Sequence, residues 1–293
     1  MHVSRRHIWV HLMLYPGHTL PTAIAPILVA AGLALHDSVF HFWPLFVAFL
    51  CSWMVHCGGV FTDVHELITR WPNLREHPEL DDALASGRLQ LSTLRAATFA
   101  WFALAFVPGI YLLHVVGARV AISFAAIGIV AAVWYSFGMA RRGLADPVFF
   151  VMFAAVAPAA AYYVQALDVT VAAFLVGIPT AALVNNVLAI DDMRDVEFDR
   201  TKGWRTTAVR HGLTGSRVLH LGQTVVAYAG TATLVGVYGP WLLLPMLTLP
   251  LAAAAERAVW TSTRREQLIP WTPRSAFLAA LHALLVCIGL ALA

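Results

Sequence analysis

The chain has 293 residues, of which 60% are hydrophobic and 12% charged, and its mean hydropathy is +0.73. A soluble globule of this size cannot bury so large an apolar fraction, so the composition excludes that class and indicates an integral membrane protein. The formal charge of +3 reflects the distribution of cations around the membrane, not a nucleic-acid partner.

Eight stretches of the chain contain no Asp, Glu, Lys or Arg, and most are near the roughly 20 residues that span a bilayer. They are 7–36, 38–62, 96–118, 120–140, 147–167, 169–190, 218–255 and 275–293. The stretch 218–255 is long enough for two crossings, and Tyr238, Gly239 and Pro240 predict a turn between them. The sequence therefore predicts an all-α integral membrane fold with nine transmembrane helices in one domain, 1–293.

The positions of Lys and Arg predict the orientation of these helices. If the N-terminus is cytoplasmic, the loops at 62–95, 141–146, 191–217 and 256–274 are cytoplasmic as well. Every Lys and Arg except Arg119 then lies on the cytoplasmic side, as the positive-inside rule requires. We expect a multi-pass protein of the inner (cytoplasmic) membrane, with the acidic loops facing the cytoplasm.

The first two predicted spans carry the first polar candidates. His18 follows the Pro16-Gly17 break and is either a ligand contact or an interfacial residue. Asp63 and Glu66 are spaced i, i+3 at the end of the second span, so both carboxylates can face one side of a helix. The alternative for this acidic pair is simple solvation in the first loop.

Spans five and six place polar groups in or near the membrane. Tyr162, Tyr163 and Gln165 end span five, where they belong either to an aromatic belt or to a substrate cavity. Asn185 and Asn186 lie deep in span six, where amides are costly without partners. We expect these two amides to point toward the acidic loop that follows.

That loop, residues 191–212, concentrates charge directly after an apolar run. Asp191, Asp195 and Asp199 fall at i, i+4 and i+8, which predicts that their carboxylates lie along one helix face. Hard carboxylate oxygens are typical Mg²⁺ ligands, and two acidic clusters on one membrane side suggest two or more ions around a diphosphate. The candidate metal ligands and catalytic residues are Asp63, Glu66, Asp191, Asp192, Asp195 and Asp199, and the candidate diphosphate-binding cations are Lys202, Arg205, Arg210 and Arg70.

With both acidic clusters placed, the chain resembles the UbiA superfamily of intramembrane prenyltransferases, in particular the 1,4-dihydroxy-2-naphthoate prenyltransferase branch of menaquinone synthesis. The resemblance covers most of the length and is carried by PGHTLPTAIAPILVA, ALASGRLQLSTL, GLADPVFFVMFAAVAPAAAYYVQ, DDMRDVEFDRTKGWRTTAVRHG and QLIPWTPRSAFLAALHALL. It implies nine helices around a cavity open to the cytoplasm and to lipid. It also implies Mg²⁺-assisted ionisation of a polyprenyl diphosphate and capture of the allylic cation by an aromatic acceptor.

Some positions depart from the family pattern. The acids of the first motif remain, but Gly59 and Thr62 replace its asparagines. Pro16 stands for the customary Arg, and Asp191-Asp192 for an Asn-Asn or Asn-Asp pair. Trp204 stands where the second motif usually has a Lys, so Lys202 or Arg205 would supply that charge.

Two rival functions share parts of this pattern. A UbiA-type terpene cyclase would ionise the same diphosphate but release a cyclic hydrocarbon without an acceptor. A cation-coupled transporter would need its carboxylates in mid-membrane, whereas here they lie at the ends of spans. Acceptor identity, prenyl length and oligomeric state do not follow from the sequence.

Overall fold

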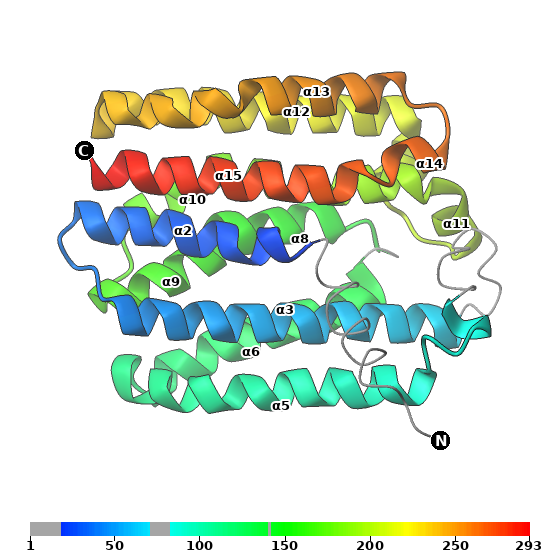
Figure 1. The fold of residues 1–293 in the computed structure, drawn as a ribbon, viewed down its shortest axis with the longest axis horizontal. Helices are drawn as coiled ribbons and strands as arrows, with labels where there is room; N and C mark the ends of the chain where they lie inside the picture. Colours follow the sequence, from blue (N-terminus) through cyan, green and yellow to red (C-terminus); the bar gives the residue numbers. More distant parts are fainter. Residues whose placement is uncertain (1–18, 71–82, 140–141) are drawn as a thin grey trace.

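A computed structural model of the chain describes residues 19–70, 83–139 and 142–293, and its regular structure in these ranges is helical. The long helices run side by side (Figure 1). The elements are α2 (Leu20–His36), α3 (Phe42–Arg70), α5 (Leu91–Val116), α6 (Ala118–Trp134), η1 (Tyr135–Met139), α8 (Ala145–Val151), η2 (Met152–Val156), α9 (Ala157–Ala166), α10 (Val171–Arg194), α11 (Val196–Thr201), α12 (Thr207–Tyr238), η3 (Pro240–Thr248), α13 (Leu249–Thr261), α14 (Arg265–Leu268) and α15 (Trp271–Ala291).

Seven helical segments of the described chain are long and apolar enough to cross a membrane: Phe42–Arg70, Leu91–Val116, Ala145–Ala166, Val171–Arg194, Thr207–Tyr238, Pro240–Thr261 and Arg265–Ala291. Two further apolar helices, Leu20–His36 and Ala118–Trp134, are shorter, with 17 residues each. An all-helical, multi-pass membrane protein is therefore confirmed. The count of nine spans remains a prediction, because it depends on these two shorter helices.

The turn predicted inside the longest apolar stretch is present. Helix α12 ends at Tyr238, and Gly239, with φ +91°, leads directly into η3 at Pro240. Because L side chains rarely adopt this conformation, glycine suits the sharp reversal between the two spans. Gly212, with φ +70°, likewise breaks the first turn of α12 from the rest of that helix.

Helix α10 is the buried centre of the bundle. It packs against α2, α12, α15 and η2, and most of its residues are buried. Gly177 allows the close approach of η2, because a Cβ there would lie 2.3 Å from the carbonyl oxygen of Ala154. By contrast, α5 buries only Leu94 and Ala105, and the described α6 buries no residue. The bundle therefore has one half with many buried side chains, around α10, and one half with few, at α5 and α6.

The acidic loop after α10 differs from the sequence expectation. Helix α10 ends at Arg194, Asp195 has φ −106° and ψ 16°, and α11 begins at Val196. Asp191, Asp195 and Asp199 thus do not share the face of one continuous helix, and that prediction is wrong. Elements α11 and α14 lie at the same end of the bundle, opposite the C-terminus (Figure 1).

Candidate active site

A cavity of about 1100 Å³ lies beside α5 and α6 and is also lined by residues of α2, α3, η2, α9 and α10. Its walls are largely apolar, with Phe102, Phe149 and Phe153 among the lining side chains. Aspartates from α3, α10 and α11, and from the link between α10 and α11, line the same cavity. One space therefore joins a charged end to a long apolar compartment.

Carboxylates dominate the charged end of this cavity. Those of the described lining residues are Asp63, Asp191, Asp192, Asp195 and Asp199. The cationic lining residues in the same part of the chain are Arg194 and Lys202. The structure thus brings Asp63 of the first predicted cluster to the aspartates of the second, with five carboxylates and two cations lining one end of the cavity.

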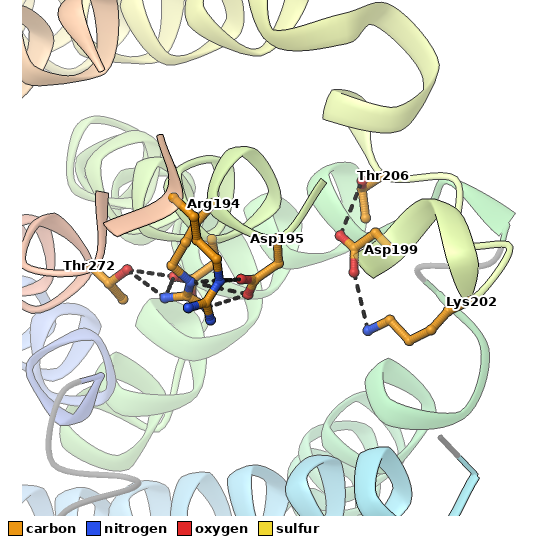
Figure 2. Close-up of polar contacts among 8 residues, drawn as sticks. Arg194, Asp195, Asp199, Lys202, Thr206 and Thr272 are labelled. Carbon is orange, nitrogen blue, oxygen red and sulfur yellow. Dashed lines mark hydrogen bonds and ion pairs between the residues drawn. The ribbon is translucent and has the colours of Figure 1, made fainter. Parts of the chain in front are cut away.

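Arg194 links the first carboxylates of the second cluster (Figure 2). Its Nη1 donates to Asp191 Oδ1 at 2.6 Å and to Thr272 Oγ1 at 3.0 Å, and its Nη2 donates to Asp195 Oδ2 at 2.6 Å. Thr272 Oγ1 in turn donates to Asp191 Oδ1 at 2.5 Å. Because α15 carries Thr272, these contacts also tie the last helix to the acidic end.

A second arginine reaches Asp195 from α14. Arg265 Nε donates to Asp195 Oδ1 at 3.1 Å, so two guanidinium groups meet this carboxylate. Neither Arg194, Arg265 nor Thr272 was among the predicted site residues. Arg194 had a local signal, since it lies i+3 from Asp191 and next to Asp195. Arg265 and Thr272 had none, because their contacts join segments about 70 to 80 residues apart.

Lys202 provides the other cation and is buried, with 6% of its surface exposed. Its Nζ lies 3.1 Å from Asp199 Oδ1, while Asp199 Oδ2 accepts from Thr206 Oγ1 at 3.4 Å (Figure 2). Burial lowers the pKa of the Lys202 ammonium, and the charge of Asp199 opposes that shift. The Trp204 ring lies against the same ammonium and also lines the cavity.

The donor chemistry of the charged end suits Mg²⁺, because its ligands would be carboxylate oxygens. Asp192 is 6% exposed, and its Oδ2 is buried without a hydrogen-bond partner. Within the described ranges, however, no three His, Cys, Asp or Glu side chains already converge as a metal site. Arginine and lysine contacts instead meet the charges of Asp191, Asp195 and Asp199.

The other predicted charged residues lie away from the cavity wall. Glu66 forms an ion pair with Arg70 one turn further along α3, and neither is among the described lining residues. Arg205 and Arg210 are exposed and are also absent from that lining. Their roles as ligands of metal or diphosphate stay predictions. His18 lies outside the described residues.

The predicted cavity residues of span five divide between two places. Tyr163 lines the cavity, whereas the Tyr162 hydroxyl donates to Asp37 Oδ2 at 2.5 Å. Gln165 Oε1 accepts from the backbone N–H of His41 at 2.6 Å. Tyr162 and Gln165 thus attach α9 to the connection between α2 and α3, which corrects their assignment to the cavity.

The two amides of α10 do not line the cavity among the described residues. Asn186 Nδ2 donates to Thr224 Oγ1 on α12 at 2.9 Å, so its side chain faces a neighbouring helix and not the acidic loop. Asn185 is 1% exposed, and its Oδ1 is buried without a hydrogen-bond partner in the described part of the chain. The expectation that both amides point to the acidic loop is therefore corrected for Asn186, which connects α10 to α12.

Comparison with known proteins finds similarity along nearly the whole chain. The UbiA prenyltransferase family matches residues 20–281. The chain is 30% identical to the 1,4-dihydroxy-2-naphthoate octaprenyltransferase of Mycobacterium tuberculosis over 86% of each chain. It is 27% identical to the Escherichia coli protein of the same name, over 98% of this chain and 96% of that one. The apo structure of a UbiA homologue from Aeropyrum pernix has a similar fold, with a TM-score of 0.66 and 16% identity over 92% of this chain and 96% of that one.

Proposed function

This chain belongs to the UbiA prenyltransferase family, and from that premise we propose that it transfers a prenyl group from a prenyl diphosphate to an aromatic acceptor such as 1,4-dihydroxy-2-naphthoate. The reaction would take place inside the membrane, in the cavity between the acidic end and the apolar walls. The relatives named for this naphthoate reaction support the choice of acceptor class.

The observation that carries the proposal is the composition of the cavity. Five carboxylates and two cations line its charged end, so a free diphosphate anion would meet a net negative surface. Such an anion binds favourably only together with further cations. The apolar remainder of the same cavity suits a hydrocarbon chain, and the two requirements together describe a metal-bound prenyl diphosphate.

Mg²⁺ is the proposed cofactor. Asp63, Asp191, Asp192, Asp195 and Asp199 would hold it, with Glu66 as a further carboxylate one turn from Asp63. When bound, it would neutralise the negative charge that develops on the departing diphosphate. Arg194, which already contacts two of these carboxylates, would keep them oriented.

The remaining steps depend on the chain's own side chains. Lys202 would bind the diphosphate from the charged end, and Arg70, Arg205 and Arg210 are the proposed cations of the surrounding loops. The bond between the allylic carbon and diphosphate oxygen breaks, and an electron-rich acceptor carbon forms the new carbon–carbon bond and loses a proton or carboxyl group. Aromatic walls such as Phe149 and Tyr135 would exclude water and stabilise positive charge on the prenyl group.

We also propose a location and an orientation. The acidic ends of α3 and α10 would face the cytoplasm in the inner membrane, because the loops at that end carry nearly all Lys and Arg. A soluble diphosphate headgroup could then reach the charged end, while the prenyl chain stays in lipid or in the apolar cavity.

The test is an assay of the purified protein in lipid nanodiscs with prenyl diphosphate, Mg²⁺ and 1,4-dihydroxy-2-naphthoate. We expect a prenylated naphthalene product by mass spectrometry and its loss when a chelator removes Mg²⁺. A cyclic hydrocarbon formed without any acceptor would instead support the terpene cyclase. Release of no diphosphate under any of these conditions would contradict prenyl transfer altogether.

A further inference from the structure

Lys202 occupies an unusual place in the composition of the chain. Lys and Arg together number 19, and Lys202 is the single lysine in the sequence. It is also buried and lines the charged end of the cavity. Lys202 therefore carries a compact ammonium group, whereas every other basic residue of the Lys and Arg set carries a planar guanidinium group.

The surroundings of Lys202 form a cage from one short segment. Its Nζ lies 3.2 Å from the ring centroid of Trp204, 4.2 Å from that of Phe198 and 3.1 Å from Asp199 Oδ1. Gly203, with φ +68°, turns the backbone between Lys202 and Trp204. The backbone N–H of Trp204 donates to the backbone carbonyl oxygen of Asp199 at 2.9 Å. The backbone thus holds the indole against the ammonium.

An aromatic face and a carboxylate act differently on an ammonium group. A carboxylate cancels its charge, whereas a ring face attracts the cation through its quadrupole and leaves the net charge in place. Asp199 supplies one carboxylate contact, and Trp204 supplies the second support without another negative charge. The ring of Trp204 therefore fixes the position of the Lys202 Nζ at the cavity without adding a second carboxylate.

We propose that Trp204 is a positioning residue, which holds the ammonium of Lys202 at the charged end of the cavity so that it binds the diphosphate of the prenyl substrate. This inference rests on the proposed function. The competing interpretation is that Trp204 only anchors the loop at the membrane interface, as tryptophans commonly do. An interfacial anchor would not control the chemistry of a buried lysine.

The single lysine allows a direct test by amine acetylation. The full-length protein in nanodiscs is treated with an N-hydroxysuccinimide acetate at fixed pH, and mass spectrometry follows the peptide that contains residue 202. Lys202→Arg is the blank. Inorganic pyrophosphate with Mg²⁺ is the probe, and its concentration for half-protection of Lys202 is measured in wild type, Trp204→Phe and Trp204→Leu. Trp260→Leu removes an exposed indole elsewhere and is the matched control.

In Trp204→Leu, we expect Lys202 to be acetylated faster and to need about fivefold more pyrophosphate for half-protection. The KM for prenyl diphosphate should rise by a similar factor, with a smaller change in kcat. Trp204→Phe should restore both values to within about twofold, because it keeps a ring face. Trp260→Leu should behave as wild type.

The outcomes distinguish the role of Trp204 from the role of Lys202. If pyrophosphate protects Lys202 in wild type and its half-protection concentration is unchanged in Trp204→Leu, the role of Trp204 is overturned. The diphosphate role of Lys202 would remain intact. No protection of wild-type Lys202 would remove Lys202 from the diphosphate site and this inference with it. Product formation in the naphthoate assay would still decide the proposed function separately. If Trp204→Leu does not fold, a Trp204→Phe variant with altered protection despite wild-type stability would contradict the inference.

Discussion

Arg194 contacts both carboxylate oxygens of Asp195, with Nη2 2.6 Å from Oδ2 and Nε 3.1 Å from each oxygen. The same guanidinium reaches Asp191, so one cation contacts two neighbouring carboxylates and offsets part of their negative charge. In the absence of Mg²⁺ this offset should matter for folding, because like charges left side by side repel.

Arg194→Gln should therefore destabilise the metal-free protein by about 1.5–3 kcal/mol, the range for hydrogen bonds to charged groups. Added Mg²⁺ should recover more stability in this variant than in wild type. Thermal unfolding in nanodiscs with chelator and with Mg²⁺ measures both effects. Arg200→Gln is the control, since Arg200 forms an exposed ion pair with Glu197 in the neighbouring helix. A loss of equal size with and without Mg²⁺ would show that Arg194 does not compensate for the metal.

The two acids of α3 should differ in importance. Asp63 lines the cavity, whereas Glu66 pairs with Arg70 outside its described lining. We expect Asp63→Asn to lower kcat/KM by about a hundredfold or more and Glu66→Gln by about tenfold, roughly 1.4 kcal/mol. The Mg²⁺ dependence of both variants is measured in the same assay. Equal losses would mean that Glu66 leaves Arg70 and acts as a full metal ligand.

Features that depend on neighbouring residues could be predicted from the sequence, whereas contacts between distant helices could not. The apolar runs and the Tyr238-Gly239-Pro240 turn depend on local chemistry. The structure has apolar helices in these runs and the turn at Gly239, as predicted. The break at Asp195 was missed, because i, i+4 spacing is equally compatible with a continuous helix and with two helices. Contacts such as Arg265 to Asp195 depend on how distant helices pack, and residue spacing carries no such information. The same limit explains Tyr162, whose partner Asp37 lies 125 residues away.

The loop cations should also rank by their position. Lys202 is buried at the cavity, while Arg205 is exposed and outside its described lining. We expect Lys202→Ala to weaken diphosphate binding by about 1.5–3 kcal/mol, and Arg205→Ala by less. The Michaelis constant for prenyl diphosphate, measured for both variants at one ionic strength, decides the order. A larger effect at Arg205 would place that loop over the substrate in the working enzyme.

A large side chain introduced at either of two glycines on the cavity wall should limit the length of the prenyl chain that the cavity accepts. An added Cβ at Gly128 or Gly109 would meet nothing within 4 Å, and both residues line the cavity. Counting along the helices from Asp63, through the Gly59–Ala132 and Gly58–Phe102 contacts, places them roughly 12 and 18 Å away at about 1.5 Å per residue.

Gly128→Leu should thus lower the maximum accepted chain length further than Gly109→Leu does, because its side chain fills the cavity closer to the diphosphate. The measurement is kcat/KM for a series of prenyl diphosphates of increasing length. Gly222→Leu, in open space outside the described cavity lining, controls for the new side chain itself. A uniform loss at all lengths in both variants would show that the chain does not run past these helices.

The exposure of most α5 and α6 side chains has a consequence for the divergence of such enzymes. The described residues of α6 include no buried side chain, and α5 has only Leu94 and Ala105, although both helices form the cavity wall. Substitutions at exposed positions usually change stability by less than about 0.5 kcal/mol. Random drift can therefore reshape the compartment that selects acceptor and chain, while the acidic residues on α3, α10 and α11 keep the ionising chemistry. New products can arise in this architecture without a prior gain in stability.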